Sequence, residues 1–183
     1  MKKYELTAEF IEKWGKKLFR IKALISFGSV EAGELGGYVE KEDNLAQDGN
    51  AWVYGNARVY GNARVYGNAW VYGNAWVYGN ARVCGDARVC GDARVCGDAD
   101  YLLIGRIGSR FSFTTFFKNK DKGITVSCGC FLGTIAEFRA KVTDTHGNNK
   151  HAKIYNLAAD MAELQILGEE HFDKLNTNKS EPF

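Results

Sequence analysis

The sequence predicts a β-solenoid with an N-terminal cap and a C-terminal α+β domain. Residues 51–98 consist of consecutive six-residue repeats of the form Ala-Trp/Arg-Val-Tyr/Cys-Gly-Asn/Asp, and no residue interrupts them. Within each repeat, Ala and Val are two positions apart, so in an extended strand they face one side while Trp or Arg faces the other. The following Gly-Asn or Gly-Asp tolerates the positive φ of a sharp corner. We therefore expect short strands with Ala and Val inside, joined by corners.

The shortness of these strands favours coiling over hairpins. Three-residue strands turned back on themselves would form almost no ladder and no shared core. If each repeat makes one side of a triangular coil, every third repeat stacks on the same side, as parallel strands around a column of Val and Ala. The resulting prism would be roughly 13 Å tall at about 4.8 Å between coils. Such a short prism cannot stand alone, so we expect it to depend on its caps and on further copies of the chain.

The repeats resemble those of the hexapeptide-repeat superfamily, whose fold is a left-handed parallel β-helix. That superfamily places an aliphatic residue four positions before a small one, as do Val53 and Ala57 here. Most members carry a small or acidic residue directly after the aliphatic one, whereas this chain carries Tyr or Cys. The Gly-Asn-Ala-Arg-Val-Tyr form is most similar to small hexapeptide-repeat proteins found in phages and in gut and Gram-positive bacteria. Residues 35–45 and 128–150 are similar to the flanks of those proteins.

The N-terminal segment, residues 1–42, reads as a cap made of a helix plus strands. Thr7 precedes an amphipathic stretch that predicts a short helix over residues 8–14. Residues 18–25 alternate in polarity and predict a strand. Residues 30–37 and 43–49 resemble degenerate first coils, because terminal repeats of solenoids are normally atypical. We place the solenoid itself at residues 43–100.

The C-terminal segment, residues 101–168, loses the six-residue period and predicts three antiparallel strands and two helices. The strands are expected at residues 101–107, 111–117 and 123–131. Thr134 and Glu137 form a capping box for a helix that ends near Gly147. Asn149 is expected to cap a second helix that ends at Gly168. The remaining residues, 169–183, are predicted to be a flexible tail.

Stacking every third repeat sorts the outward residues into three columns. The first column contains Trp52, Trp70 and Arg88, the second contains Arg58, Trp76 and Arg94, and the third contains Arg64 and Arg82. Trp and Arg are the commonest anchors of interfaces, so these columns predict contacts between subunits of a homo-oligomer. They also suit a groove that stacks a flat base on Trp and pairs its phosphate with Arg. We therefore expect the ligand-binding residues to be Trp52, Trp70, Trp76, Arg58, Arg64, Arg82 and Arg88.

The cysteine and histidine residues give weaker signals. Cys84, Cys90 and Cys96 would lie at three separate corners of one coil, too far apart to share a metal ion. Cys128 and Cys130 are predicted on one strand face, with His146 and His151 near the next helix, so a Cys-His nucleophilic pair is conceivable. We expect these residues to serve packing and capping, and we predict neither catalytic nor metal-binding residues nor a cofactor. The loop that contains His146, Lys150 and His151 could instead contact an anion.

The composition restricts the function classes. The net charge is only +2, and it is spread evenly along the chain, so strong nucleic-acid attraction is not expected. The five cysteines have no framework spacing and fit reduced thiols. No apolar run reaches membrane length, and no secretory signal is recognisable at the start. We therefore expect a cytoplasmic protein, located in the host cell if a phage encodes it.

These observations predict a non-enzymatic, homo-oligomeric binding protein, most simply a trimer. The resemblance to phage proteins implies a counter-defence role. In that role the protein would sequester a small anionic signal, such as a cyclic nucleotide, or would block a host defence protein. Two alternatives are an acyl-CoA-dependent acyltransferase, the commonest activity of the superfamily, and an architectural module. The acyltransferases use a histidine from a coil or protruding loop, and residues 51–98 contain no His and no insertion.

Overall fold

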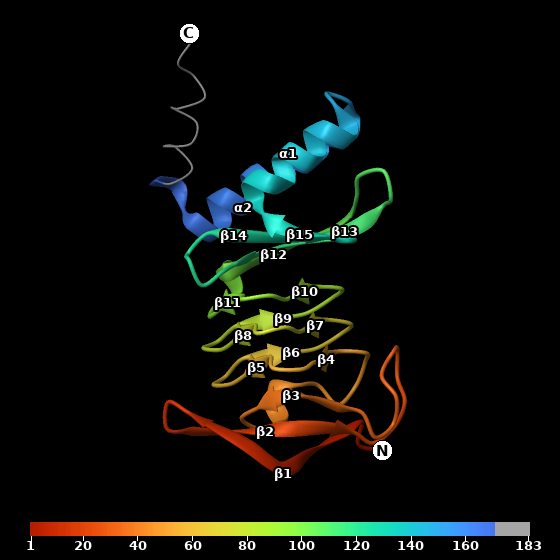
Figure 1. Ribbon diagram of the computed structural model, residues 1–183, viewed down its shortest axis with the longest axis vertical. Helices are drawn as coiled ribbons and strands as arrows, with labels where there is room; N and C mark the ends of the chain where they lie inside the picture. Colours follow the sequence, from red (N-terminus) through yellow and green to blue (C-terminus); the bar gives the residue numbers. More distant parts are fainter. Residues whose placement is uncertain (171–183) are drawn as a thin grey trace. The chain divides into compact units, whose positions relative to one another are not determined.

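The structure, a computed structural model, describes residues 1–170 (Figure 1). The chain divides into two compact units, Met1–Asp98 and Ala99–Phe183, which we describe separately. The predicted tail, residues 169–183, lies outside the described residues except for Glu169 and Glu170.

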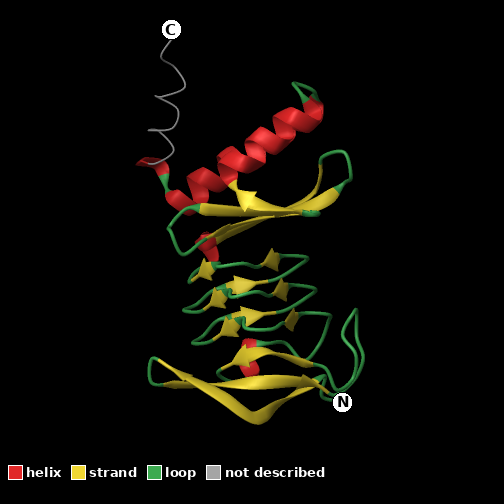
Figure 2. Cartoon of the chain, in the orientation of Figure 1, coloured by secondary structure: helices red, strands yellow, loops and turns green. Residues whose placement is uncertain are grey.

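The repeats of the first unit form a parallel β-solenoid, as predicted (Figure 2). Each repeat contributes one two-residue strand. The strands are β4 (Trp52–Val53), β5 (Arg58–Val59), β6 (Arg64–Val65), β7 (Trp70–Val71), β8 (Trp76–Val77), β9 (Arg82–Val83), β10 (Arg88–Val89) and β11 (Arg94–Val95). Every third strand pairs in parallel, which gives the stacks β4-β7-β10, β5-β8-β11 and β6-β9.

The core of the solenoid is the predicted column of Ala and Val. Every Ala and Val of the repeats is at most 1% exposed. Backbone hydrogen bonds join successive coils, for example from the Trp52 N–H to the Ala69 carbonyl at 3.0 Å. The corners bring backbones into close contact: a Cβ on Gly73, whose φ is +71°, would lie 2.9 Å from the Gly91 nitrogen. Glycine is therefore required there for both its conformation and its size.

Side-chain amides at the corners form a ladder between coils. The Asn50 amide donates to the Asn68 carbonyl oxygen at 3.2 Å, and the Asn68 amide donates to the Asp86 carboxylate at 3.2 Å. An Asn inside such a ladder must donate and accept, whereas its last member need only accept. This explains why the final coil carries Asp in place of Asn.

The amide ladder should contribute to the free energy of unfolding, and this contribution can be measured by comparing two Asn positions. Asn68→Ala removes two amide hydrogen bonds and should lower the free energy of unfolding by about 1 kcal/mol. Asn56 occupies the same position of its repeat, but its side chain takes no part in the ladder bonds between the described residues. Asn56→Ala should therefore cost much less in a urea titration, and equal losses for both variants would contradict the ladder's contribution.

The N-terminal cap consists of strands, so the predicted helix over residues 8–14 is wrong. Strand β1 (Tyr4–Lys13) pairs antiparallel with β2 (Lys16–Ala23), and Lys13 lies opposite Lys16. The connecting residues, Trp14 and Gly15, have φ values of 53° and 72°. Two central residues with positive φ form the tight turn that suits a two-residue hairpin. The strand predicted over residues 18–25 is confirmed as β2.

The cap also supplies an irregular first coil. Strand β3 (Leu35–Val39) pairs with β2 on one side and in parallel with β5 on the other. After the short helix η1 (Glu42–Asn44), Leu45 bridges to Val65, so the degenerate coil predicted over residues 43–49 is confirmed. The buried Asn44 amide donates to the Ala63 carbonyl at 2.8 Å. The irregular coil thereby provides hydrogen-bond partners for backbone groups at the open edge of the first regular coil.

The second unit is an antiparallel sheet with two helices packed on one face (Figure 2). After the short helix η2 (Asp98–Asp100), the sheet order follows the chain: β12 (Tyr101–Ile107), β13 (Ser112–Lys118), β14 (Ile124–Cys128) and β15 (Phe131–Thr134). The prediction of three strands is wrong, because residues 123–131 fold back at Gly129 to give two strands, β14 and the start of β15. The sheet core includes Phe116 and Val126.

Both helices of the second unit are confirmed with their predicted caps. Helix α1 (Ile135–His146) begins with the Thr134–Glu137 capping box and is capped at its end by Gly147. Helix α2 (Lys150–Leu167) is capped at its start by Asn149, whose side chain accepts hydrogen bonds from the His151 and Ala152 N–H groups, and at its end by Gly168.

Candidate functional site

The strand registers confirm the order of residues in the three predicted columns. Trp70 lies between Trp52 and Arg88, and Trp76 lies between Arg58 and Arg94. Arg64 pairs with Arg82 in the third column. The columns differ in how much of their surface the rest of the unit covers, and this difference decides which of them can bind a ligand.

In the first column, the prediction that Trp52 is an outward stacking surface is wrong. Trp52 is 0% exposed, because the N-terminal cap folds over it. The ring of Tyr4 meets it edge-on with centroids 6.0 Å apart, and Phe27 does so at 5.4 Å. Trp52 therefore belongs to the core of this unit and cannot stack a ligand. Farther along the column, Trp70 is half-buried, with Tyr54 beside it and the Arg88 guanidinium 5.0 Å from its ring centre.

The second column is occupied by contacts within the chain. The guanidinium groups of Arg58 and Arg94 lie 5.6 and 3.8 Å from the ring centre of Trp76. Trp14, at the tip of the β1–β2 hairpin, also meets the Trp76 ring, with centroids 4.6 Å apart. The Arg94 guanidinium further donates to the Asn74 carbonyl at 3.2 Å. Trp76 is therefore already stacked, so its predicted role as a free base-stacking surface is not supported by its surroundings.

The third column is different, because no aromatic ring separates its two guanidinium groups. Arg64 and Arg82 are both exposed and directly opposite each other on adjacent parallel strands. Neighbouring strands are about 4.8 Å apart, so two like charges in register repel each other. Two hollows meet at Arg64. One has a volume of about 470 Å³ and is lined by Ala46, Asp48, Arg64, Tyr66, Gly67 and Arg82. The other has a volume of about 220 Å³ and is lined by Lys41, Asp43, Asn62, Ala63 and Arg64.

The larger hollow combines three kinds of binding group. Arg64 and Arg82 are positively charged hydrogen-bond donors, Asp48 is a negatively charged acceptor, and Tyr66 offers an exposed ring. The hydrogen bond between Tyr66 and Cys84 raises the pKa of the Tyr66 phenol above its ordinary value. The hollow is therefore suited to a ligand that carries an anion, a flat ring and a hydrogen-bond donor.

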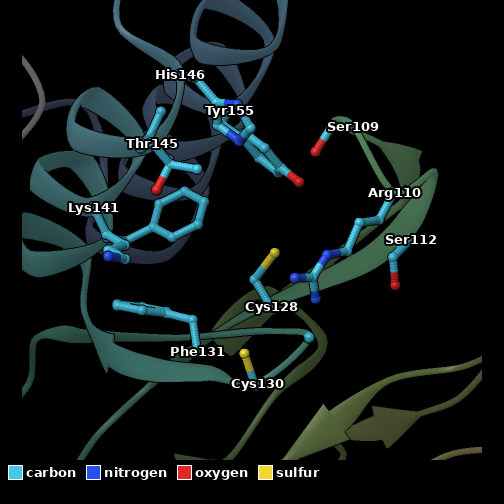
Figure 3. A pocket seen from close by; sticks show the side chains of 13 residues that line it. Ser109, Arg110, Ser112, Cys128, Cys130, Phe131, Lys141, Thr145, His146 and Tyr155 are labelled. Carbon is cyan, nitrogen blue, oxygen red and sulfur yellow. The ribbon is translucent and has the colours of Figure 1, made fainter.

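In the second unit, the structure brings some of the predicted Cys and His residues together. Cys128 ends β14, but Cys130 lies in the turn that follows, so the two do not share one strand face as predicted. Both line a pocket with His146 (Figure 3). The ring of His151 lies 5.8 Å from that of His146, with the two planes tilted by 53°, but His151 does not line the pocket.

Among the pocket residues that sequence reasoning missed are Arg110 and Tyr155. They lie on a loop and a helix that are far apart in the sequence, and neither belongs to a recognisable motif. Burial raises the pKa of the Tyr155 phenol to about 12, with a further contribution from Cys128. The Thr114 hydroxyl donates to the Cys128 sulfur at 3.2 Å.

Neither metal sites nor membrane spans are found in the described part of the chain. Within residues 1–170, no three His, Cys, Asp or Glu side chains gather closely enough to hold a metal ion. Among the same residues, no helix has the length and apolar character needed to cross a bilayer.

Comparison with known proteins agrees with the architecture. A family model described as the YdcK beta solenoid repeat matches residues 51–63, 57–73, 63–79 and 75–91. These matches lie within the hexapeptide repeats and, together with the observed coils, define a β-solenoid repeat protein. The search of curated proteins gives no match.

The burial of Trp52 gives a second prediction. Trp52→Ala should lower the free energy of unfolding by about 3–5 kcal/mol, because it opens a cavity in the core between the cap and the first coil. Trp70→Ala, one coil farther along the same column, removes a half-buried ring and should cost less than half as much. Chemical denaturation of both variants checks this. Equal losses would mean that the cap does not hold Trp52 as described.

Proposed function

We propose that this chain is a non-enzymatic, homo-oligomeric binding protein whose third column binds a small anionic nucleotide. The observation that carries the proposal is the in-register pair Arg64 and Arg82, which is exposed and has no ring between its charges. Two adjacent guanidinium groups can both donate hydrogen bonds to one bound anion. The other columns already place most of their Arg charge against Trp rings of the same chain.

The chemistry of the larger hollow matches that of a nucleotide. Guanidinium groups bind phosphate through paired, charge-assisted hydrogen bonds. The exposed Tyr66 ring can stack on a base, and the Asp48 carboxylate can accept a hydrogen bond from an exocyclic amine. The volume of about 470 Å³ lies within the range of about 300–1,000 Å³ that is common for small-ligand sites. A cyclic oligonucleotide, with several phosphates and bases, would engage more than one copy of the site.

Exposed apolar residues support self-association, which we propose to give a trimer. The cap exposes Phe10, Trp14 and Leu35, which are 42%, 56% and 48% exposed. Phe10 and Trp14 lie on the same β1–β2 hairpin, and Trp14 contacts Trp76 of the second column. Apolar side chains of this size gather at protein interfaces more often than on free surfaces.

The biological role that fits is counter-defence, in which the protein sequesters a nucleotide signal in the host cytoplasm. The resemblance of the repeats to those of phage-borne hexapeptide proteins supports this role. An acyltransferase fits less well, since residues 51–98 contain no histidine to act as a general base.

Calorimetric titration of cyclic di- and trinucleotides tests the proposed ligand. We expect wild type to bind at least one of them, and Arg64→Gln to weaken binding at least about tenfold, the loss of one charge-assisted contact. Arg88→Gln is the matched control, because Arg88 is an exposed Arg that stacks on Trp70 in the first column. If no nucleotide binds wild type, the sequestration proposal fails, and a host defence protein becomes the better candidate partner.

Native mass spectrometry of the freshly purified protein tests assembly. We expect three subunits, and Trp14→Ser should shift the population towards monomer because it removes an exposed apolar ring. Lys13→Ser, in the adjacent position of the hairpin, should leave the subunit count unchanged. A monomeric wild type at micromolar concentration would contradict the oligomeric part of the proposal.

A further inference from the structure

The pocket in the second unit has an apolar interior and a polar rim (Figure 3). Its volume is about 200 Å³. The apolar lining comes from Phe131, Phe138, Val142 and Tyr155, which belong to β15 and to both helices. The rings of Phe131 and Phe138 lie 5.6 Å apart, and that of Phe138 meets Tyr155 edge-on at 5.6 Å. This aromatic lining favours an apolar ligand of limited size.

Arg110 supplies positive charge at the opposite side of the pocket. It lies in the loop between β12 and β13, and its guanidinium points towards Cys128 (Figure 3). A Cβ on Gly129 would lie only 3.5 Å from the Arg110 guanidinium, so this group sits directly over the β14–β15 turn. Within residues 1–170, no carboxylate pairs with Arg110. The guanidinium is therefore available to an anion in the pocket.

The second cation of the rim, Lys141, already has an acidic partner. The Lys141 ammonium pairs with the Asp144 carboxylate at 3.2 Å on the same face of α1. Arg110 is consequently the group that would select for a negatively charged ligand. Lys141, a paired cation on the same rim, serves as the control for the effect of removing a positive charge.

The Arg110 loop is held in place by Tyr155. A Cβ on Gly108 would overlap the Tyr155 hydroxyl group, so the loop backbone packs directly on this ring. His146 stacks on the other part of the Tyr155 ring, with centroids 5.8 Å apart and planes 29° from parallel. The rim near Arg110 also carries the Ser109 and Ser112 hydroxyls, which can donate to a bound oxygen.

We propose that this pocket binds a small monocarboxylate with an aromatic or branched aliphatic body. The carboxylate pairs with Arg110 and the serine hydroxyls, and the body contacts Phe131 and Phe138. The site is separate from the nucleotide site proposed on the solenoid, and its volume is smaller than the range of about 300–1,000 Å³ that is common for larger ligands. Cys128 lines the pocket, so its thiol can report whether the site is occupied.

The test is a calorimetric titration of the whole chain with benzoate, phenylacetate and 3-methylbutanoate. We expect at least one to bind, and Arg110→Gln to weaken that binding at least about tenfold. Lys141→Gln, the matched control on the same rim, should change it less than about twofold. Melting temperatures of both variants should equal that of wild type, because both side chains are exposed.

A neutral probe and an inorganic anion test separately the two contacts that we propose, that of the carboxylate with Arg110 and that of the apolar body with the aromatic rings. The amide of the best-binding acid has the same shape without the charge, and it should bind at least about tenfold more weakly. Inorganic phosphate should not compete. The bound acid should also slow the alkylation of Cys128 by iodoacetamide, with Cys96 of the solenoid as the reference thiol. The proposal is overturned if none of the three acids binds, if the amide binds equally well, if phosphate competes fully, or if Arg110→Gln has no effect.

Discussion

The structure depends on one constraint: with a strict six-residue period, each side chain of the solenoid lies against the same position of the next coil. Identical residue types are therefore often stacked on each other, and the chemistry of the residue decides whether this stacking stabilises the solenoid. Val and Ala pack into a continuous core, and Asn extends an amide ladder. Tyr60 stacks on Tyr78 with ring centroids 5.2 Å apart and planes only 9° from parallel. Arginine is the residue for which this arrangement is unfavourable, because a guanidinium repels its own copy.

Two of the three columns avoid this repulsion by alternating residue types. In the second column, Trp76 lies between two arginines, so each guanidinium meets a ring face. The first column places Arg88 against Trp70 in the same way. The third column has no ring to insert, and its two arginines remain in register. The stacking that builds the fold thus also creates the site that we propose for an anion.

Local patterns in the sequence were sufficient for the repeats and for both helices, because the period and the caps each lie within a few residues. Predictions failed where distant segments decide the outcome. Tyr4 and Phe27 cover Trp52, and no feature near Trp52 indicates this. The helix predicted over residues 8–14 ignored the turn at Trp14 and Gly15, because Trp seldom adopts positive φ. Similarly, Arg110 and Tyr155 meet only when the loop packs on the helix.

The replacement of Asn by Asp in the last coil affects where additional coils could be added to the solenoid. An amide both donates and accepts, so a coil that carries Asn at position 68 can have a neighbour on each side. A carboxylate only accepts, and a second carboxylate stacked on it would add repulsion. Duplication of the Asn-bearing coil, residues 63–80, would preserve the core of Ala and Val and extend the amide ladder, whereas duplication of the Asp-bearing coil would place Asp86 against its own copy. The amide ladder therefore favours lengthening within the array over lengthening at its C-terminal end.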